Sequence, residues 1–243
     1  MRAILVAVDY SDYLRYTLPY NRHHFDDVMV VTTPLDSGAI RIAEENHCKV
    51  FCTNAFYDDG ADFNKWKALE SALDTYGRYG WLCLMDADVL WPKKIDHQVY
   101  QTGFLYGPLR RMLREVQYPF PPESEWRKYQ VHRNVNEWAG YTQIFHADDP
   151  HLPAPPWHEI NWRHAGGADS FFQRLWPASN KIRTPWEVLH LGASGCNWCG
   201  RATDYLGGGG KPEDGSQRMD QVRKYVASRR RNRPDPYADE RVG

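Results

Sequence analysis

The stretch Trp81-Leu82-Cys83-Leu84-Met85-Asp86-Ala87-Asp88-Val89-Leu90 joins a continuous run of apolar residues to two aspartates separated by one small residue. A short apolar run of this kind predicts a strand that is buried on both faces. Residues two apart on an extended segment point to the same side, so Asp86 and Asp88 are expected to project together from the carboxyl end of the strand, where open α/β sheets bind ligands. Adjacent carboxylates repel each other unless a cation lies between them, and oxygen ligands suit Mg²⁺ or Mn²⁺. The stretch therefore predicts a metal site that holds a phosphorylated ligand.

The Asp-x-Asp triplet alone is weak support for this interpretation. If aspartate makes up roughly one residue in sixteen, the triplet occurs by chance about once in a chain of this length. The prediction rests instead on the position of the two aspartates at the carboxyl end of a buried strand.

Strand-like and helix-like segments alternate before that stretch. Apolar runs predict strands over 3–8, 28–33 and 49–53. Helical patterns follow each run: one through Leu14 and Leu18 capped by Ser11 or Asp12, one over 40–46, and one over 63–76 capped by Asp62. This alternation predicts an α/β fold, an open twisted and mostly parallel sheet flanked by helices, in a doubly wound arrangement.

Composition and missing motifs exclude several classes of protein. The chain of 243 residues has 42% hydrophobic and 25% charged residues, which is ordinary for a globular protein. Its net charge of −1 argues against a uniformly basic nucleic-acid binder. The first strand has no Gly-x-Gly-x-x-Gly after it, and the chain has no P-loop pattern, which disfavours dinucleotide enzymes and P-loop phosphotransferases. With no apolar run of membrane-spanning length and no signal peptide, we expect a cytoplasmic protein with mostly reduced cysteines.

The order of three motifs resembles the GT-A family of nucleotide-sugar-dependent glycosyltransferases. An α/β half ends in Asp-x-Asp about 90 residues into the chain. The later segment Gly166-Gly167-Ala168-Asp169-Ser170-Phe171-Phe172 resembles the family's glycine-containing stretch with an acid at a helix start, and Val188-Leu189-His190-Leu191-Gly192 resembles its C-terminal metal-binding histidine segment. The resemblance covers roughly residues 3–201 and implies a GT-A (Rossmann-like) fold. Ala168 stands where many relatives carry a second acid, so only Asp169 carries over.

By resemblance, Asp86, Asp88 and His190 would bind Mn²⁺ or Mg²⁺, which bridges the diphosphate of a UDP-sugar. Asp86 would lie nearer the ribose, and Asp88 would be the more direct ligand. Asp169 would be the general base that accepts the proton of the attacking hydroxyl, which implies inversion at the sugar carbon. A retaining mechanism is the alternative if Asp169 lies too far from the reacting carbon. The remaining expected contacts to the nucleotide sugar come from strand ends, the helix before the central strand and a C-terminal loop: Val8, Asp9, Tyr10, Thr33, Asp36, Lys65, Ala87 and Arg201, besides Asp86.

Plainer interpretations remain open for several of these residues. The alternatives are a core histidine for His190, a solvated helix lysine for Lys65 and a helix cap for Asp169. Cys196 and Cys199 form a Cys-x-x-Cys pair, and with Cys48 and Cys52 they would complete a four-ligand zinc site. A loop over the site, in which Arg201 pairs with a phosphate, is favoured over zinc.

The second part of the chain is expected to select the acceptor. We expect one catalytic domain over 1–217, with a nucleotide-sugar half over about 1–95 and an acceptor half over about 96–217, followed by a basic helix or tail over 218–243. The segment over 118–162 is rich in proline and aromatic residues and predicts long ordered loops. The tail carries seven basic residues between Arg218 and Arg233 against the single acid Asp220, which favours either a solvated helix or contact with a phosphate backbone.

That basic end resembles compact GT-A enzymes of bacterial viruses, and it implies 5-hydroxymethylpyrimidine in DNA as the acceptor, with the base leaving the stack. A saccharide or cell-surface glycan is the alternative acceptor. Two other classes stay open: a nucleotidyltransferase, which would normally have an early phosphate-binding loop, and a non-catalytic nucleotide-sugar binder, which would have no use for Asp169.

Overall fold

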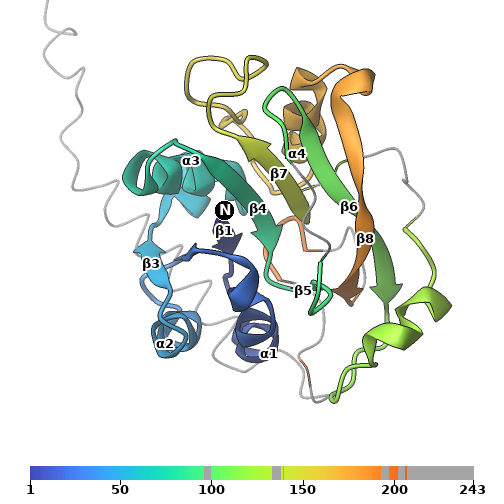
Figure 1. Cartoon of the computed structure of the whole chain (residues 1–243). Helices are drawn as coiled ribbons and strands as arrows, with labels where there is room; N and C mark the ends of the chain where they lie inside the picture. The colour runs from blue at the N-terminus through green and yellow to red at the C-terminus, as the bar shows by residue number, and fades with distance from the viewer. Residues whose placement is uncertain (96–99, 133–137, 139, 193–196, 202–205, 207–243) are drawn as a thin grey trace, which may run out of the picture.

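The computed structural model describes residues 1–95, 100–132, 138, 140–192, 197–201 and 206. A mixed sheet with helices on both faces forms the molecule (Figure 1). The strands are β1 Arg2–Val6, β2 Asp27–Thr32, β3 Lys49–Cys52, β4 Trp81–Asp86, β5 Val89–Leu90, β6 Leu105–Leu113, β7 Thr142–His146 and β8 Lys181–Leu191. The α-helices are α1 Ser11–Asn21, α2 Ser37–Glu45, α3 Lys65–Tyr76 and α4 Ala168–Phe172. The 3₁₀ segments are η1 Arg22–His24, η2 Ala55–Gly60, η3 Glu123–Lys128, η4 Gln173–Leu175 and η5 Ala178–Asn180.

The eight strands of the described part lie in the order β3-β2-β1-β4-β7-β6-β8-β5. The pairings are parallel from β3 through β2 and β1 to β4, and again between β6 and β8. Strand β7 is antiparallel to both of its neighbours, and β5 is antiparallel to β8. The predicted α/β class, with an open and mostly parallel sheet flanked by helices, is confirmed.

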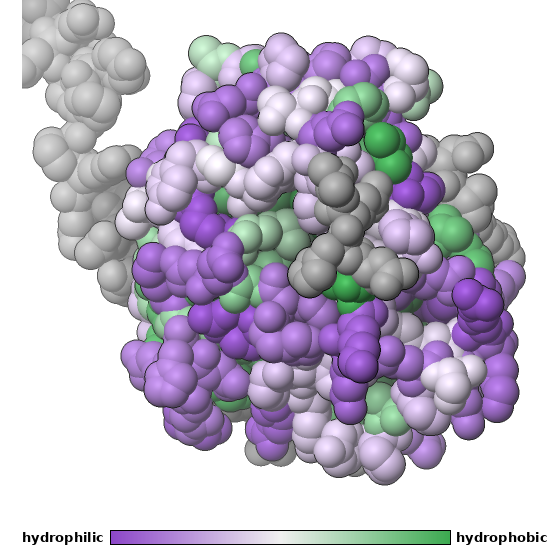
Figure 2. Space-filling model, viewed as in Figure 1, coloured by the Kyte–Doolittle hydropathy of each residue, from purple (hydrophilic) through white to green (hydrophobic). Residues whose placement is uncertain are grey.

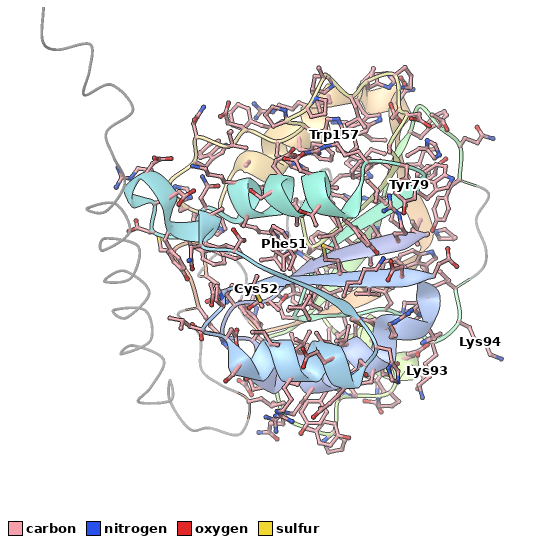
Figure 3. All side chains as sticks on the ribbon, turned by 90° about the vertical axis from the view of Figure 1, so that its left-hand side faces the viewer. Phe51, Cys52, Tyr79, Lys93, Lys94 and Trp157 are labelled. Carbon is pink, nitrogen blue, oxygen red and sulfur yellow. The ribbon has the colours of Figure 1, made fainter. Side chains whose placement is uncertain are left out.

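The core is divided between the two faces of the sheet. Because side chains alternate along a strand, Ile4 of β1 packs in the cluster that contains Trp66 and Leu69 of α3, whereas Leu5 packs in the cluster that contains Leu14 of α1. Figure 3 shows α3 over one face and α2 over the other. Burying both faces explains the continuous apolar runs of β1, β2 and β4, since each fully buried Leu or Ile stabilises the fold by about 1.5–3 kcal/mol.

The central stretch is two strands rather than one. Strand β4 ends at Asp86, Ala87 and Asp88 form a turn, and β5 begins at Val89. The argument from strand alternation was therefore wrong for Asp88. The turn nevertheless brings Asp86 and Asp88 to the same cavity.

Two predicted helix caps were wrong. The N-cap of α1 is Tyr10, which makes no capping bond through its side chain, and Ser11 and Asp12 lie in the first turn. The N-cap of α3 is Asn64, whose side-chain oxygen accepts the N–H of Lys67 at 3.0 Å. Asp62 lies two residues before this N-cap. Its N–H donates to the carbonyl oxygen of Arg163 at 2.8 Å, so this part of the chain is bound to a distant segment and is not yet helical.

The predicted loop region over 118–162 contains a strand of the sheet. Strand β7 lies between β4 and β6 in the middle of the sheet, where its Ile144 pairs with Cys83 of β4. It is only five residues long, so its short pattern did not distinguish it from the surrounding loops. Strand β6 was also missed, because Gly107, Pro108 and two arginines interrupt its apolar pattern.

The face drawn in Figure 2 is mostly hydrophilic, with hydrophobic areas that are small and separate. In the portion that the structure describes, no helix combines the length and the apolar character needed to cross a membrane. The basic segment over 218–243 lies outside the described residues, and the division of the chain into halves and a tail stays a prediction.

Candidate active site

A cavity of about 490 Å³ opens at the carboxyl ends of β1 and β4. Its walls come from both halves of the sheet, from the start of α3, from α4 and from the segment 197–201. The predicted site residues that line it are Val8, Tyr10, Lys65, Asp86, Ala87, Asp88, Asp169, His190 and Arg201. Residues separated by more than 180 positions in the sequence therefore meet in one cavity.

Asp86 is held in place through both its backbone and its side chain. Its N–H donates to the carbonyl oxygen of Tyr141 at 3.1 Å. Its carboxylate accepts a hydrogen bond from the ammonium group of Lys65, and the two groups form an ion pair. The predicted lysine thus faces the cavity, but its first partner there is the carboxylate of Asp86.

Asp88 and His190 form the part of the site that suits a cation. The side chains are 9% and 5% exposed, and Asp88 Oδ1 lies 3.8 Å from His190 Nε2. That separation is too long for a hydrogen bond, yet two ligands that each bind one cation at about 2.1 Å can be this far apart. Within the described residues, Asp88 Oδ1 and His190 Nδ1 have no hydrogen-bond partner. A buried carboxylate oxygen without a partner is costly, so these two residues fit a divalent ion.

The pKa shifts of Asp88 and His190 are also consistent with a cation between them. Burial raises the pKa of Asp88, and the nearby charge of Asp86 raises it further, although His190 acts in the opposite direction. Burial also lowers the pKa of His190, which keeps its ring neutral, as a metal ligand must be. A bound cation would favour the ionised form of Asp88.

The three predicted metal ligands do not form a ready-made site together. In the ranges that the structure describes, no three His, Cys, Asp or Glu side chains are close enough to hold a metal ion. Lys65 occupies the Asp86 carboxylate instead. Because Mg²⁺ commonly uses one or two carboxylates with substrate phosphates as further ligands, the missing ligands would have to come from a bound diphosphate.

Asp169 lies on another wall of the cavity, in the first turn of α4. One carboxylate oxygen accepts the N–H of Gly140 at 2.8 Å, and the other accepts the N–H of Ser170 at 2.8 Å. The helix begins after Gly167 without a side-chain capping bond, so Asp169 is not its cap. Gly140 suits this close approach, because a Cβ there would make tight contacts of 3.0 Å with both Asp169 Cβ and the ring of Trp66.

Three predicted nucleotide contacts do not line the cavity: Asp9, Thr33 and Asp36. Thr33 and Asp36 are only 2% and 1% exposed. Asp36 caps α2 through the N–H of Ala39 at 3.0 Å, and it accepts the N–H of Asp9 at 2.8 Å. Asp9 has a φ of 62°, a conformation that non-glycine residues rarely adopt. Asp36 therefore shapes the loop that carries Val8 and Tyr10 rather than reaching the cavity.

Arg201 also has a structural partner. Its guanidinium forms a two-pronged ion pair with Asp12 and donates to the carbonyl oxygen of Asp9 at 2.8 Å. It also lies over the ring of Tyr10, 4.7 Å from the centroid, and the Tyr10 hydroxyl accepts a hydrogen bond from Asn197 at 2.6 Å. The segment 197–201 thus closes over the first loop, and the guanidinium predicted to pair with a phosphate is bound to Asp12.

Sequence reasoning missed the lining residues that come from β6, from the segment after it and from the segment before β7. These residues are Arg110, His132, Gly140 and Tyr141. Arg110 and Arg111 interrupt an otherwise mostly apolar segment, and this was the one available signal in the sequence.

The cysteines do not support the zinc alternative where they are described. Cys48 is buried, Cys52 and Cys199 are exposed, and all three are free thiols. Figure 3 labels Cys52 on the edge strand β3. Cys196 lies outside the described residues.

Comparisons with known proteins give distant structural likenesses. No protein-family model and no curated protein matches the sequence. Mannosyl-3-phosphoglycerate synthase from Rubrobacter xylanophilus matches at 13% identity and a TM-score of 0.46, over 94% of this chain and 72% of that chain. Glucosyl-3-phosphoglycerate synthase from Mycobacterium tuberculosis, solved with Mn²⁺, UDP and glucosyl-3-phosphoglycerate, matches at 13% identity and a TM-score of 0.44, over 97% and 81%.

GalNAc-T7, solved with UDP, GalNAc and Mn²⁺, matches at 15% identity and a TM-score of 0.49. The match covers 98% of this chain but only 52% of that chain, so this chain spans about half the length of GalNAc-T7.

Proposed function

We propose that this chain is a metal-dependent glycosyltransferase that moves a sugar from a UDP-sugar to a hydroxyl acceptor. The observation that carries the proposal is the shared cavity: Asp88 and His190 face each other on one wall, and Asp169 lies on another. Asp88 and His190 fit a cation, and Asp169 supplies a carboxylate that can act as a base. The order of the three motifs in the sequence, which resembles the GT-A family, agrees with this arrangement.

The donor is proposed to lie between β1 and the turn after β4. Val8 and Tyr10 would contact the nucleoside, and Lys65 would exchange its contact with Asp86 for a diphosphate oxygen. Asp88 and His190 would hold Mn²⁺ or Mg²⁺, with Asp86 joining once Lys65 has moved. When bound, the cation would stabilise the negative charge that develops on the departing UDP.

The acceptor is proposed to lie beside Asp169. The acceptor hydroxyl oxygen bonds to the anomeric carbon while the bond from that carbon to the diphosphate breaks, and the hydroxyl proton passes to Asp169. The bonds from Gly140 and Ser170 hold the carboxylate in position and leave it other lone pairs for this proton. A base on the face opposite the leaving group makes the reaction inverting.

The finer identity of the acceptor stays a prediction from the sequence. The 5-hydroxymethylpyrimidine of DNA, with a bacteriophage setting, was inferred from arginines over 218–233, and these lie outside the described residues. A saccharide or cell-surface glycan is the other proposed acceptor. The expected cytoplasmic location likewise stays a prediction.

Two proposals of another class would use the same aspartates. A nucleotidyltransferase would release diphosphate from a nucleoside triphosphate, and a nucleotide-sugar binder would bind a UDP-sugar without consuming it. The GT-A interpretation is favoured over both because Asp169 faces the cavity that holds the aspartates.

The test combines purified protein with Mn²⁺, a panel of radiolabelled UDP-sugars and pools of hydroxyl acceptors, including a hydroxymethylcytosine duplex and oligosaccharides. We expect UDP release and a product that is heavier by one sugar, both of which stop when a chelator is added. Tight binding of UDP-sugar without UDP release would indicate the non-catalytic binder, and diphosphate release from a nucleoside triphosphate would indicate the nucleotidyltransferase.

A further inference from the structure

Arg110, a half-buried arginine of β6, lines the same cavity. We propose that the acceptor carries an anionic group, a phosphate or a carboxylate, which Arg110 binds while the acceptor hydroxyl meets Asp169. This inference rests on the proposed glycosyl transfer and adds the chemical class of its acceptor: a small hydroxyl compound with one anionic group.

Arg110 differs from the other long cationic side chains of the cavity in having no carboxylate partner. Lys65 is paired with Asp86, and Arg201 is paired with Asp12. In the part of the chain that the structure describes, Arg110 makes no ion pair, and its buried Nε has no hydrogen-bond partner. A positive charge in a partly enclosed cavity attracts an anion more strongly than the same charge on open surface.

The contact that Arg110 does make leaves its hydrogen-bond donors available. Its guanidinium carbon lies 4.5 Å from the centroid of the Tyr141 ring. Stacking uses the flat face of the guanidinium, whereas the N–H groups point outward in its plane and match the two oxygens of a carboxylate or phosphate. Tyr141 is itself fixed, because its hydroxyl donates to the carbonyl oxygen of Pro108 at 2.6 Å. The arginine is thus packed against a ring that is itself held in place.

The same tyrosine links Arg110 to the proposed base. Tyr141 follows Gly140 directly, and the N–H of Gly140 holds the carboxylate of Asp169 at 2.8 Å. Arg110 and Asp169 therefore contact two consecutive residues of one short segment, and both line the cavity. One small molecule can place its anion at the arginine and its hydroxyl at the aspartate.

The sheet order separates this subsite from the proposed position of the nucleoside. Val8 and Tyr10 lie in the loop after β1, on one side of β4, whereas Arg110 belongs to β6, two places away on the other side. His190 lies on β8, the strand next to β6, so the proposed anion subsite is on the side of the cation site. A single unpaired arginine also suits one anionic group better than a strand of nucleic acid, which is bound along a row of positive charges.

The experiment compares three acceptors that share one ring and differ in charge: glucose, glucose 6-phosphate and glucuronate. Initial rates are measured with Mn²⁺ and the best UDP-sugar for the wild type, Arg110→Gln and Arg110→Lys. We expect the wild type to prefer a charged acceptor at least tenfold in kcat/KM. Arg110→Gln should raise KM for that acceptor at least tenfold and affect glucose much less, with Arg110→Lys in between. The phosphate and carboxylate arms identify which anion is used.

Two matched measurements separate this role from others. Arg114→Gln makes the same change at an exposed arginine just beyond β6, outside the cavity lining, and should behave as the wild type. The dissociation constant of UDP with Mn²⁺, measured by calorimetry, should change less than twofold in Arg110→Gln. A tenfold loss of UDP affinity would overturn the proposal, because Arg110 would then bind the donor diphosphate.

Other outcomes would also overturn it. Equal rates for neutral and charged acceptors, or transfer to hydroxymethylcytosine DNA that does not depend on Arg110, would show that the cavity has no such anion subsite. If the wild type binds no UDP and consumes no UDP-sugar, the proposed function itself fails. Calorimetry with glucose 6-phosphate alone then decides the subsite: binding that Arg110→Gln abolishes supports it, and no binding overturns it.

Discussion

The backbone N–H of Asp86 donates to the carbonyl oxygen of Tyr141 at 3.1 Å. This bond extends the antiparallel pairing of β4 with β7 to the last residue of β4. The residue before Tyr141 is Gly140, whose N–H holds Asp169. One short backbone segment therefore fixes the spacing between the first aspartate of the proposed donor site and the proposed base. Pre-positioning of this kind is valuable for transfer reactions, because small displacements of reacting groups are costly in rate.

Replacing Asp88 with Asn should weaken Mn²⁺ binding by at least tenfold, which corresponds to about 1.4 kcal/mol. The same change removes a buried carboxylate whose Oδ1 has no partner, so the metal-free variant should unfold at a higher temperature than the wild type. Calorimetric titration with Mn²⁺ and thermal unfolding measure the two effects. Asp148→Asn is the control, because the side chain of Asp148 is 82% exposed. Unchanged Mn²⁺ affinity would remove Asp88 from the proposed ligands.

Replacing Asp169 with Asn should reduce turnover by about 10²–10⁴-fold, the usual contribution of a general base. The amide oxygen can still accept the N–H of Gly140, whereas the bond from Ser170 is lost, which should cost about 1 kcal/mol of stability. The affinity for UDP should be retained. Single-turnover rates and UDP titrations measure these quantities. A variant that keeps wild-type turnover would show that another group accepts the proton.

Replacing Lys65 with Gln should have opposite effects on metal and nucleotide. Without the lysine, Asp86 loses its ion-pair partner, so Mn²⁺ alone should bind several-fold tighter, whereas UDP should bind several-fold more weakly. Lys67→Gln is the matched control on the same helix, because Lys67 pairs with Asp58 and Asp59 outside the cavity. Weaker binding of both ligands in Lys65→Gln would mean that the lysine mainly holds the loop in shape.

The buried pair of Glu70 and His158 should make stability depend on pH. His158 Nδ1 lies 2.6 Å from Glu70 Oε1, its ring stacks between Trp66 and Phe172, and its Nε2 has no partner in the described residues. Burial lowers the pKa of His158 below its usual 6.5. The unfolded chain therefore takes up a proton first as the pH falls through 6.5, and the free energy of unfolding should decrease from there downward.

The pKa of Glu70 adds a second decrease at lower pH. Burial raises this pKa, but the hydrogen bonds from His158 and the charge of Arg78 outweigh burial and bring it below its usual 4.5. The stability that this gives is present above pH 4.5 and is lost as the pH falls through the lowered pKa. Urea unfolding from pH 7.5 to 5.5 tests the histidine step. His158→Phe keeps the stacking and should flatten the curve, whereas His47→Asn, at an exposed position, should not.

Particular elements show how far the sequence alone could lead. The apolar runs of β1, β2 and β4 were sufficient to predict the α/β class, because a strand buried on both faces must be apolar at every position. The same runs located Asp86 and Asp88, and the later motifs located Asp169 and His190. All four line one cavity, although the sequence treated Asp88 as part of a strand and the structure places it in a turn.

Only the tertiary structure decided what those residues contact. Residue patterns report which side chains are buried, but the partner of a charged group depends on which distant segments the sheet brings together. Strand β7 entered between β4 and β6, and this brought Gly140 to Asp169 and Tyr141 to Arg110. The same packing placed Arg201 in an ion pair with Asp12 and Lys65 in an ion pair with Asp86. The physical reason is range: local periodicity is set by neighbours within a few residues, whereas an ion pair forms between groups a few ångströms apart in space, however far apart they are in the chain.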